Sequence, residues 1–424
     1  MSIPSPSWHR LRRILFWFRL ALMLCVAGFV IQLSIWNRDL DPRFFRFLGT
    51  PPGKMLARVM NWPTMYDTGA FDKNLSEYSE EELKWRDHLL SELQARTPSH
   101  LLTSKPTLSW RDVRLQMDYP TLTLSHSPHF SILSDAPFHQ IATSVEAMEH
   151  LRSQYLDIFS SLVRYPKPDT SLQLLYFSNE SDYREHQQRA VPLLENSIGY
   201  YSPLEDRLVL FNHQFSDHTQ AIHDHVQQEI DFLSEQMDSE AEQEQLDQAH
   251  QRLTRYIQDQ ASMETLATLR HEGAHYLSYT YGVHSWIHTE NAWLIEGIAT
   301  YFEAPLPGQS VPSYLNMITK MVMEDRLPTL ANFMAVRLPS DFATDLPQIE
   351  PHEAYALSWS LFRLCMSPPY RASFFEYVKD LQEPKDLSTL MKTSRVERLA
   401  AYLSVSSTEL EAEWQRSLHD SNAL

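Results

Sequence analysis

Three residues suited to metal-dependent hydrolysis stand together in the sequence His271-Glu272-Gly273-Ala274-His275. Residues four apart on a helix project from one face about 6 Å apart, so the imidazoles of His271 and His275 could share one cation. Neutral imidazole nitrogen is a favoured zinc ligand. Glu272 reaches the edge of the same face, where its carboxylate could take a proton from a metal-bound water. The pattern predicts a zinc site; the alternative is three polar residues on an ordinary amphipathic helix.

A second segment, residues 291–303, supplies a candidate third ligand. Its apolar sequence is typical of a buried helix, with Asn291 as a candidate N-cap. Glu296 lies 21 residues after His275 among apolar neighbours, where an unpaired carboxylate would be costly to bury. Two histidines, one glutamate and an open fourth position make a hydrolytic zinc site rather than a structural one. We therefore expect Glu296 to bind the same zinc.

Three of the nine glycines, Gly273, Gly282 and Gly297, fall in these two segments and the turn between them. Gly282 suits the left-handed position that follows a helix. We attribute the others to close approach of the two helices at the metal.

The two segments resemble the gluzincin zinc peptidases of the peptidase MA-like superfamily. The likeness rests on His271-Glu272-x-x-His275 followed by Trp293-Leu294-x-Glu296-Gly297-x-Ala299-x-Tyr301-Phe302-Glu303, and around Glu296 it is especially close to the membrane alanyl aminopeptidases. The resemblance implies one Zn²⁺ per chain held by His271, His275 and Glu296, with Glu272 as general base. It also implies a thermolysin-like fold in which an edge strand holds an extended peptide, and we expect Arg207–Phe211 to be that strand.

The sequence departs from the aminopeptidases in one respect. It has no segment like Gly-Ala-Met-Glu-Asn, which in those enzymes anchors the free N-terminus of the substrate. We therefore expect an endopeptidase, or an unusual specificity, rather than an aminopeptidase.

Members of the superfamily also use a donor, often Tyr or His, to stabilise the oxyanion of the tetrahedral intermediate. Tyr355, in the helical segment His352–Trp359, is the best candidate by position and type, although a core tyrosine is an equal interpretation. His284 and His288 are weaker candidates. Three other polar residues near the ligands are expected to be solvated or to cap helices: Glu264, Thr300 and Glu303.

The apolar pattern predicts a helix-rich α+β protein with a mixed sheet. Four segments have the alternation or apolar run of strands: Thr121–Ser125, His129–Leu133, Leu172–Phe177 and Arg207–Phe211. A helix is expected at Phe138–Val163. Two amphipathic helices joined near Asp238–Ser239 should form an acidic hairpin over Asp217–Gln260, inserted relative to a minimal catalytic core.

The N-terminus predicts a membrane segment. Residues 14–36 form an apolar run of 23 residues whose one charge is Arg19, long enough to span a bilayer, and they follow the basic residues Arg10, Arg12 and Arg13. We expect an uncleaved single-pass signal-anchor with a cytoplasmic N-terminus and a periplasmic or other extracytoplasmic catalytic domain; a cleaved signal peptide is the alternative.

The expected organisation is residues 1–13 cytoplasmic, 14–36 transmembrane, 37–106 membrane-proximal spacer, 107–216 mixed-sheet subdomain, 217–260 hairpin, 261–367 zinc-binding region and 368–424 C-terminal helical layer.

The composition excludes several classes of function. The chain has 36 Lys+Arg against 54 Asp+Glu, a net charge of −18, so it lacks the basic surface that nucleic-acid binding needs. No glycine-rich phosphate loop can be assembled from the nine glycines, which argues against ordinary nucleotide binding. Two cysteines cannot form a disulfide framework or a cysteine-based zinc site.

These observations favour a membrane-anchored zinc metallopeptidase that acts on a peptide or protein. In this hypothesis a zinc-bound water, deprotonated by Glu272, attacks the scissile carbonyl while Tyr355 stabilises the oxyanion. The alternative is a catalytically weak zincin-like scaffold that binds a protein partner through the 217–260 hairpin. A third interpretation is that the histidines bind no metal.

Overall fold

The structure of the protein is a computed structural model that describes residues 110–164, 171–190, 197–202, 205–237, 239–284, 291–382 and 394–419. The expected signal-anchor at residues 14–36 and the spacer at residues 37–106 lie outside this range. Within the described ranges, every helix is too short or too polar to cross a bilayer.

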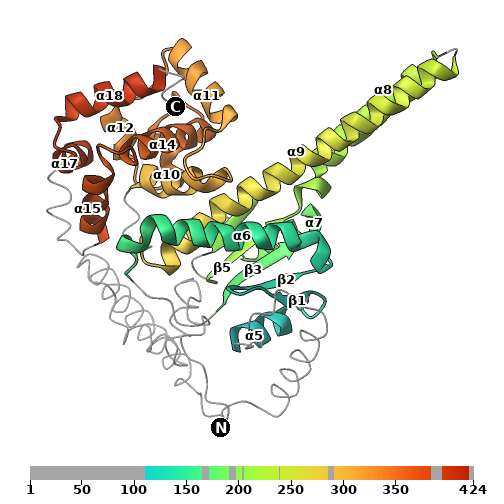
Figure 1. Ribbon diagram of the computed structural model, residues 1–424, viewed down its shortest axis with the longest axis horizontal. Helices are drawn as coiled ribbons and strands as arrows, with labels where there is room; N and C mark the ends of the chain where they lie inside the picture. Colours follow the sequence, from blue (N-terminus) through green and yellow to red (C-terminus); the bar gives the residue numbers. More distant parts are fainter. Residues whose placement is uncertain are drawn as a thin grey trace, which may run out of the picture.

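The sheet has five strands in the order β1-β2-β3-β5-β4 (Figure 1). In chain order they are β1 (Thr123–His126), β2 (Phe130–Ser134), β3 (Leu172–Phe177), β4 (Gly199–Ser202) and β5 (Arg207–Phe211). β2, β3 and β5 are parallel, whereas β1 and β4 are antiparallel strands at the two edges. The sheet is therefore mixed, as the sequence predicts.

Helices cover both faces of the sheet. Alternate residues of a strand point to opposite faces, so Leu174 of β3 joins a large core with α6 (Phe138–Phe159) and α9 (Glu240–Thr280), while Leu175 joins a smaller one with α5 (Trp110–Asp118) and α7 (Glu180–Ala190). Tyr276 ties α9 to the sheet: its hydroxyl accepts the Gln173 N–H at 2.8 Å and donates to the Asp206 carbonyl at 2.8 Å. The helix that carries the two histidines is thus fixed to the sheet.

The four expected strands are present, but the expected edge strand is wrong. Arg207–Phe211 (β5) lies between β3 and β4, so it is an inner strand. The edge on this side of the sheet is β4, which pairs with β5 from Gly199↔Leu210 to Ser202↔Arg207. β4 has only four residues and begins with glycine, so it lacks the apolar run by which its neighbours are recognised.

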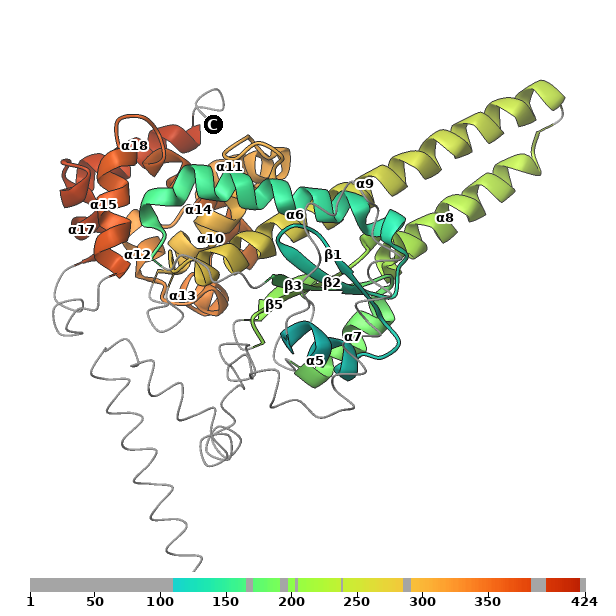
Figure 2. The ribbon, with the colours of Figure 1, turned by 60° about the horizontal axis from the view of Figure 1, so that its bottom comes forward.

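The acidic hairpin consists of α8 (Asp217–Ser234) and the first half of α9. Ser216 caps α8, because its Oγ accepts the Thr219 N–H at 3.0 Å. α9 does not stop near Gln260 but continues unbroken to Thr280, a total of 41 residues. Figures 1 and 2 show the pair of helices projecting far beyond the sheet, so one helix forms part of the projection and also carries His271 and His275.

The remaining helices form a C-terminal layer that meets α9 through α10. They are α10 (Ala292–Glu303), α11 (Pro312–Met323), α12 (Leu330–Ala335), α13 (Phe342–Asp345), α14 (Pro351–Cys365), α15 (Arg371–Gln382), α17 (Arg395–Tyr402) and α18 (Ser407–His419), with short 3-10 turns at Ser160–Leu162, His213–Phe215 and Pro339–Asp341. α10 lies between α9 and α14 and packs against both. The C-terminal part is helical, as its sequence predicts.

Candidate metal centre

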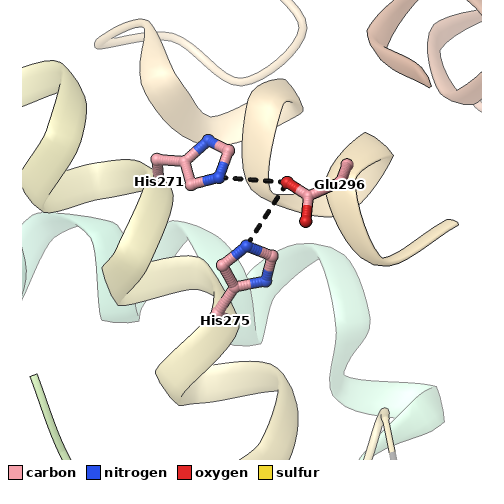
Figure 3. Close-up of side chains that lie close together, drawn as sticks. All are labelled: His271, His275 and Glu296. Atoms are coloured by element: carbon pink, nitrogen blue, oxygen red, sulfur yellow. Dashed lines mark ion pairs between the residues drawn. The ribbon is translucent and has the colours of Figure 1, made fainter. Parts of the chain in front are cut away.

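The side chains of His271, His275 and Glu296 converge between α9 and α10 (Figure 3). Glu296 Oε2 lies 3.2 Å from His271 Nε2 and 3.6 Å from His275 Nε2. One ligand atom from each residue lies within 4.8 Å of the others. This is the arrangement that the spacing of four and the third-ligand helix predict.

The three side chains are almost inaccessible. Their exposed fractions are 13% for His271, 12% for His275 and 6% for Glu296. Burial alone would raise the pKa of Glu296, but the nearby His275 and His271 side chains outweigh it and hold that pKa at about 2. Glu296 is therefore ionised, and a buried carboxylate is stable here because two imidazoles face it.

His271 is also held from its other side. Its Nδ1 contacts Glu303 Oε1 at 2.6 Å, and the Tyr314 hydroxyl on α11 donates to both Glu303 oxygens at 2.7 Å. A carboxylate on Nδ1 fixes the tautomer that leaves Nε2 free to bind a metal. The expectation that Glu303 is solvated or caps a helix is wrong, because α10 packs so closely on α9 that Glu303 points at His271.

Glu272, the expected general base, lies close enough to His271, His275 and Glu296 for their charges to act on it. Its Oε2 accepts the backbone N–H of Tyr201, on the edge strand β4, at 2.9 Å. Burial raises the pKa of Glu272, and the charges of His271 and His275 partly oppose this. A carboxylate with a raised pKa is a better proton acceptor near neutral pH than an exposed one.

Tyr355 lies beside the centre, in the first turns of α14. Its ring centroid is 5.9 Å from that of His271. The charge of Glu296, followed by burial, raises the pKa of Tyr355, so the phenol stays protonated and able to donate. Its hydroxyl forms no hydrogen bond with any described residue, which leaves that donor available.

The other residues singled out in the sequence have different positions. His284 is close enough to the centre that the charges of His275 and Glu296 act on it, but burial dominates and lowers its pKa to about 3. His288 lies outside the described residues. Glu264 is exposed on α9, and the Thr300 hydroxyl donates to the backbone carbonyl of Glu296 at 2.7 Å.

Two details of the helix ends and glycines need correction. Asn291 is at the N-cap of α10, but its side chain makes no capping hydrogen bond. A Cβ on Gly273 would lie 2.7 Å from Leu151 Cδ2 on α6, and one on Gly297 would lie 2.8 Å from Phe362 Cβ on α14. Gly273 therefore allows α6 to pack closely against α9, and Gly297 allows α14 to pack closely against α10. The expected explanation, close approach of α9 and α10 to each other, is wrong for these two glycines.

Gly282 has the expected role. Its φ of 70° is in the left-handed region, directly after the end of α9.

A family model described as "Protein of unknown function (DUF1570)" matches residues 265–388. The chain is similar to this family over a segment that begins within α9 and contains His271, Glu272, His275, Glu296 and Tyr355. No curated protein matches the chain significantly.

The residues present fit a zinc ion. Two imidazole nitrogens and a carboxylate oxygen are the donor set of hydrolytic zinc sites. Although Glu296 Oε2 is buried and close to both histidines, it accepts no well-aligned hydrogen bond from a described residue. A cation between the three side chains would satisfy that oxygen.

Proposed function

We propose that the protein is a membrane-anchored zinc metallopeptidase, with a thermolysin-like catalytic fold of the gluzincin type. The observation that carries the proposal is the convergence of His271, His275 and Glu296 at a buried point beside Glu272. The anchor is residues 14–36, and the catalytic part would face the periplasm or another extracytoplasmic space.

In this proposal His271, His275 and Glu296 hold the zinc, which supplies Lewis acidity toward water and toward the carbonyl oxygen of the substrate. Glu272 takes the proton from the attacking water and later delivers it to the leaving nitrogen. The Tyr355 hydroxyl donates a hydrogen bond to the oxyanion that forms at the carbonyl. Glu303 keeps His271 in the required tautomer.

The substrate would be an extended peptide segment bound along β4. This strand is the edge of the sheet nearest Glu272, whose carboxylate accepts the Tyr201 N–H. Backbone pairing with an edge strand needs no free substrate N-terminus. Together with the missing aminopeptidase anchor, this favours endopeptidase activity.

The test is Glu272→Gln, which keeps the shape of the side chain and removes the base. We expect hydrolysis of a fluorescent unfolded protein such as labelled casein to fall by about 10²-fold or more, with zinc content unchanged. Glu264→Gln, an exposed position on the same helix, is the control and should retain full activity. Full activity in Glu272→Gln would refute the assignment of the base.

A specific observation also favours the second candidate, a scaffold that binds a protein partner through the hairpin. Phe232 is 61% exposed and Tyr256 is 60% exposed on the two helices that project from the body, so a partner that bound along the hairpin could bury these apolar rings. Pull-down of a partner that is lost on shortening the hairpin, but kept in Glu272→Gln, would favour the scaffold, provided that no hydrolysis is detected in the unmodified protein.

A further inference from the structure

A cavity lies in the C-terminal helical layer, beside the second half of α14. It has a volume of about 560 Å³ and is bounded by the end of α10, the C-terminal half of α14 and α18. These helices lie side by side in the C-terminal layer (Figures 1 and 2). A volume of this size is typical of sites for small organic ligands.

The cavity is separate from the metal centre. None of His271, Glu272, His275, Glu296 or Tyr355 lines it. Arg363, which does, follows Tyr355 by eight residues, about 12 Å along the helix axis.

The cavity wall contains two arginines and one carboxylate. Arg363 and Arg416 both line it, and neither forms an ion pair with a described residue. Arg363 Nη1 is buried and has no hydrogen-bond partner among the described residues, and its guanidinium lies 5.3 Å from the centroid of the Trp359 ring. A buried guanidinium donor without an acceptor is costly, and an anion beside the Arg363 guanidinium would offset part of that cost.

The one carboxylate in the wall does not supply that acceptor. Glu413 accepts a hydrogen bond from the Tyr370 hydroxyl and makes no ion pair with Arg363 or Arg416 within the described part of the chain. Arg416 donates one hydrogen bond to a described residue, from its Nε to the Ala412 carbonyl at 3.3 Å. Both guanidinium groups of the cavity wall therefore have N–H donors that are not used by a described residue.

The rest of the wall is partly apolar. Leu364 and Met366 line it together with the Tyr301 ring, and Ser417 adds a hydroxyl. Such a wall suits a ligand with an apolar portion behind a charged head.

We propose that this cavity binds a small organic anion, with a carboxylate or phosphate head at Arg363 and Arg416 and a short apolar tail against Leu364 and Met366. Guanidinium groups bind both kinds of oxyanion through paired hydrogen bonds. The proposal does not depend on the metal centre or on hydrolysis.

The test is calorimetric titration of the full-length protein with hexanoate, with monohexyl phosphate and with 1-hexanol. We expect one site per chain for at least one of the anions, and binding of 1-hexanol at least about tenfold weaker because it lacks the charged head. Whichever anion binds more tightly identifies the head group.

Two substitutions assign the site. Arg363→Gln and Arg416→Gln should each weaken anion binding by about tenfold. Arg416 is exposed, so its substitution keeps the test valid even if Arg363→Gln disturbs folding. The matched control is Arg252→Gln on α9, an equally exposed arginine whose Nε also bonds the carbonyl four residues earlier, at 3.2 Å, and it should change nothing.

Three results would overturn the proposal. The first is no binding of either anion to the unmodified protein at millimolar concentration. The second is anion binding that Arg416→Gln leaves unchanged, and the third is 1-hexanol binding as tightly as the anions.

Discussion

His271 is held through both of its ring nitrogens: Nε2 faces Glu296, and Nδ1 contacts Glu303, which the Tyr314 hydroxyl holds in turn. The sequence predicts the first contact from the spacing of the ligands. For the contact between His271 and Glu303, the only signal in the sequence is that Glu303 follows Glu296 by seven residues, two turns along one face of α10. Whether that face meets His271 depends on the packing of α10 against α9, which spacing within one helix does not determine.

Glu303→Gln tests this support. The amide keeps the size of the side chain but loses the charge that orients His271, so zinc affinity should fall by about tenfold or more. Competition with a fluorescent chelator measures the affinity. Tyr314→Phe, which leaves the carboxylate in place, should have a smaller effect, and unchanged affinity in Glu303→Gln would show that the contact has no such role.

Tyr355→Phe tests the oxyanion donor. Removal of the hydroxyl should lower kcat by about 10²-fold while zinc content stays the same, because the lost hydrogen bond forms only in the transition state. The readout is kcat and KM on the labelled casein. A normal kcat would mean that Tyr355 is a core residue, the other interpretation of its sequence position.

At the scale of elements, α14 places Tyr355, and its first turn is held by charge. Arg326 Nη1 and Nη2 each lie 2.7 Å from a Glu353 oxygen, and Glu353 Oε2 also accepts the Glu350 N–H at 2.9 Å in a capping box. The hydrogen bonds from Arg326, partly opposed by burial, lower the pKa of Glu353 to about 2. The part of the stability at the start of α14 that comes from Arg326 and Glu353 is therefore present only while Glu353 is ionised.

This gives a pH dependence with a definite sign. A carboxylate with a depressed folded-state pKa contributes stability above its unfolded pKa of about 4.3, and the contribution is lost as pH falls toward 2. Glu353→Gln should lower the urea midpoint at pH 7, and its difference from the unmodified protein should shrink between pH 4.5 and pH 2. Urea titrations across that range measure it; a difference that does not change with pH would contradict the argument.

The elements that the sequence predicts well are those with a long periodic pattern. α6 begins at Phe138 as expected, and the four apolar strands lie within two residues of their expected starts. β4 could not be foreseen, because its four residues are a strand only through pairing with β5. That pairing decides which strand is at this edge, so the sequence alone predicts β5 as the edge strand in place of β4.

At the scale of the whole molecule, α9 links three parts of the chain. Its first half projects with α8, its last quarter carries the histidines, and Tyr276, directly after His275, bonds the sheet. The sequence predicts a hairpin and a metal-binding helix, but the change from polar to mixed residues near Gln260 hides that they are one helix. A force or partner acting on the hairpin would thus act on the helix that holds two of the three proposed ligands.

The central claim is that this chain binds one zinc through two histidines and a glutamate from a second helix. Zinc per chain, measured by mass spectrometry of the metal in the purified full-length protein at neutral pH without chelator, tests it most directly. We expect about one zinc in the unmodified protein and in the control Glu264→Ala, and a sharp loss in Glu296→Ala. Zinc absent from the unmodified protein, or retained fully in Glu296→Ala, would contradict the account.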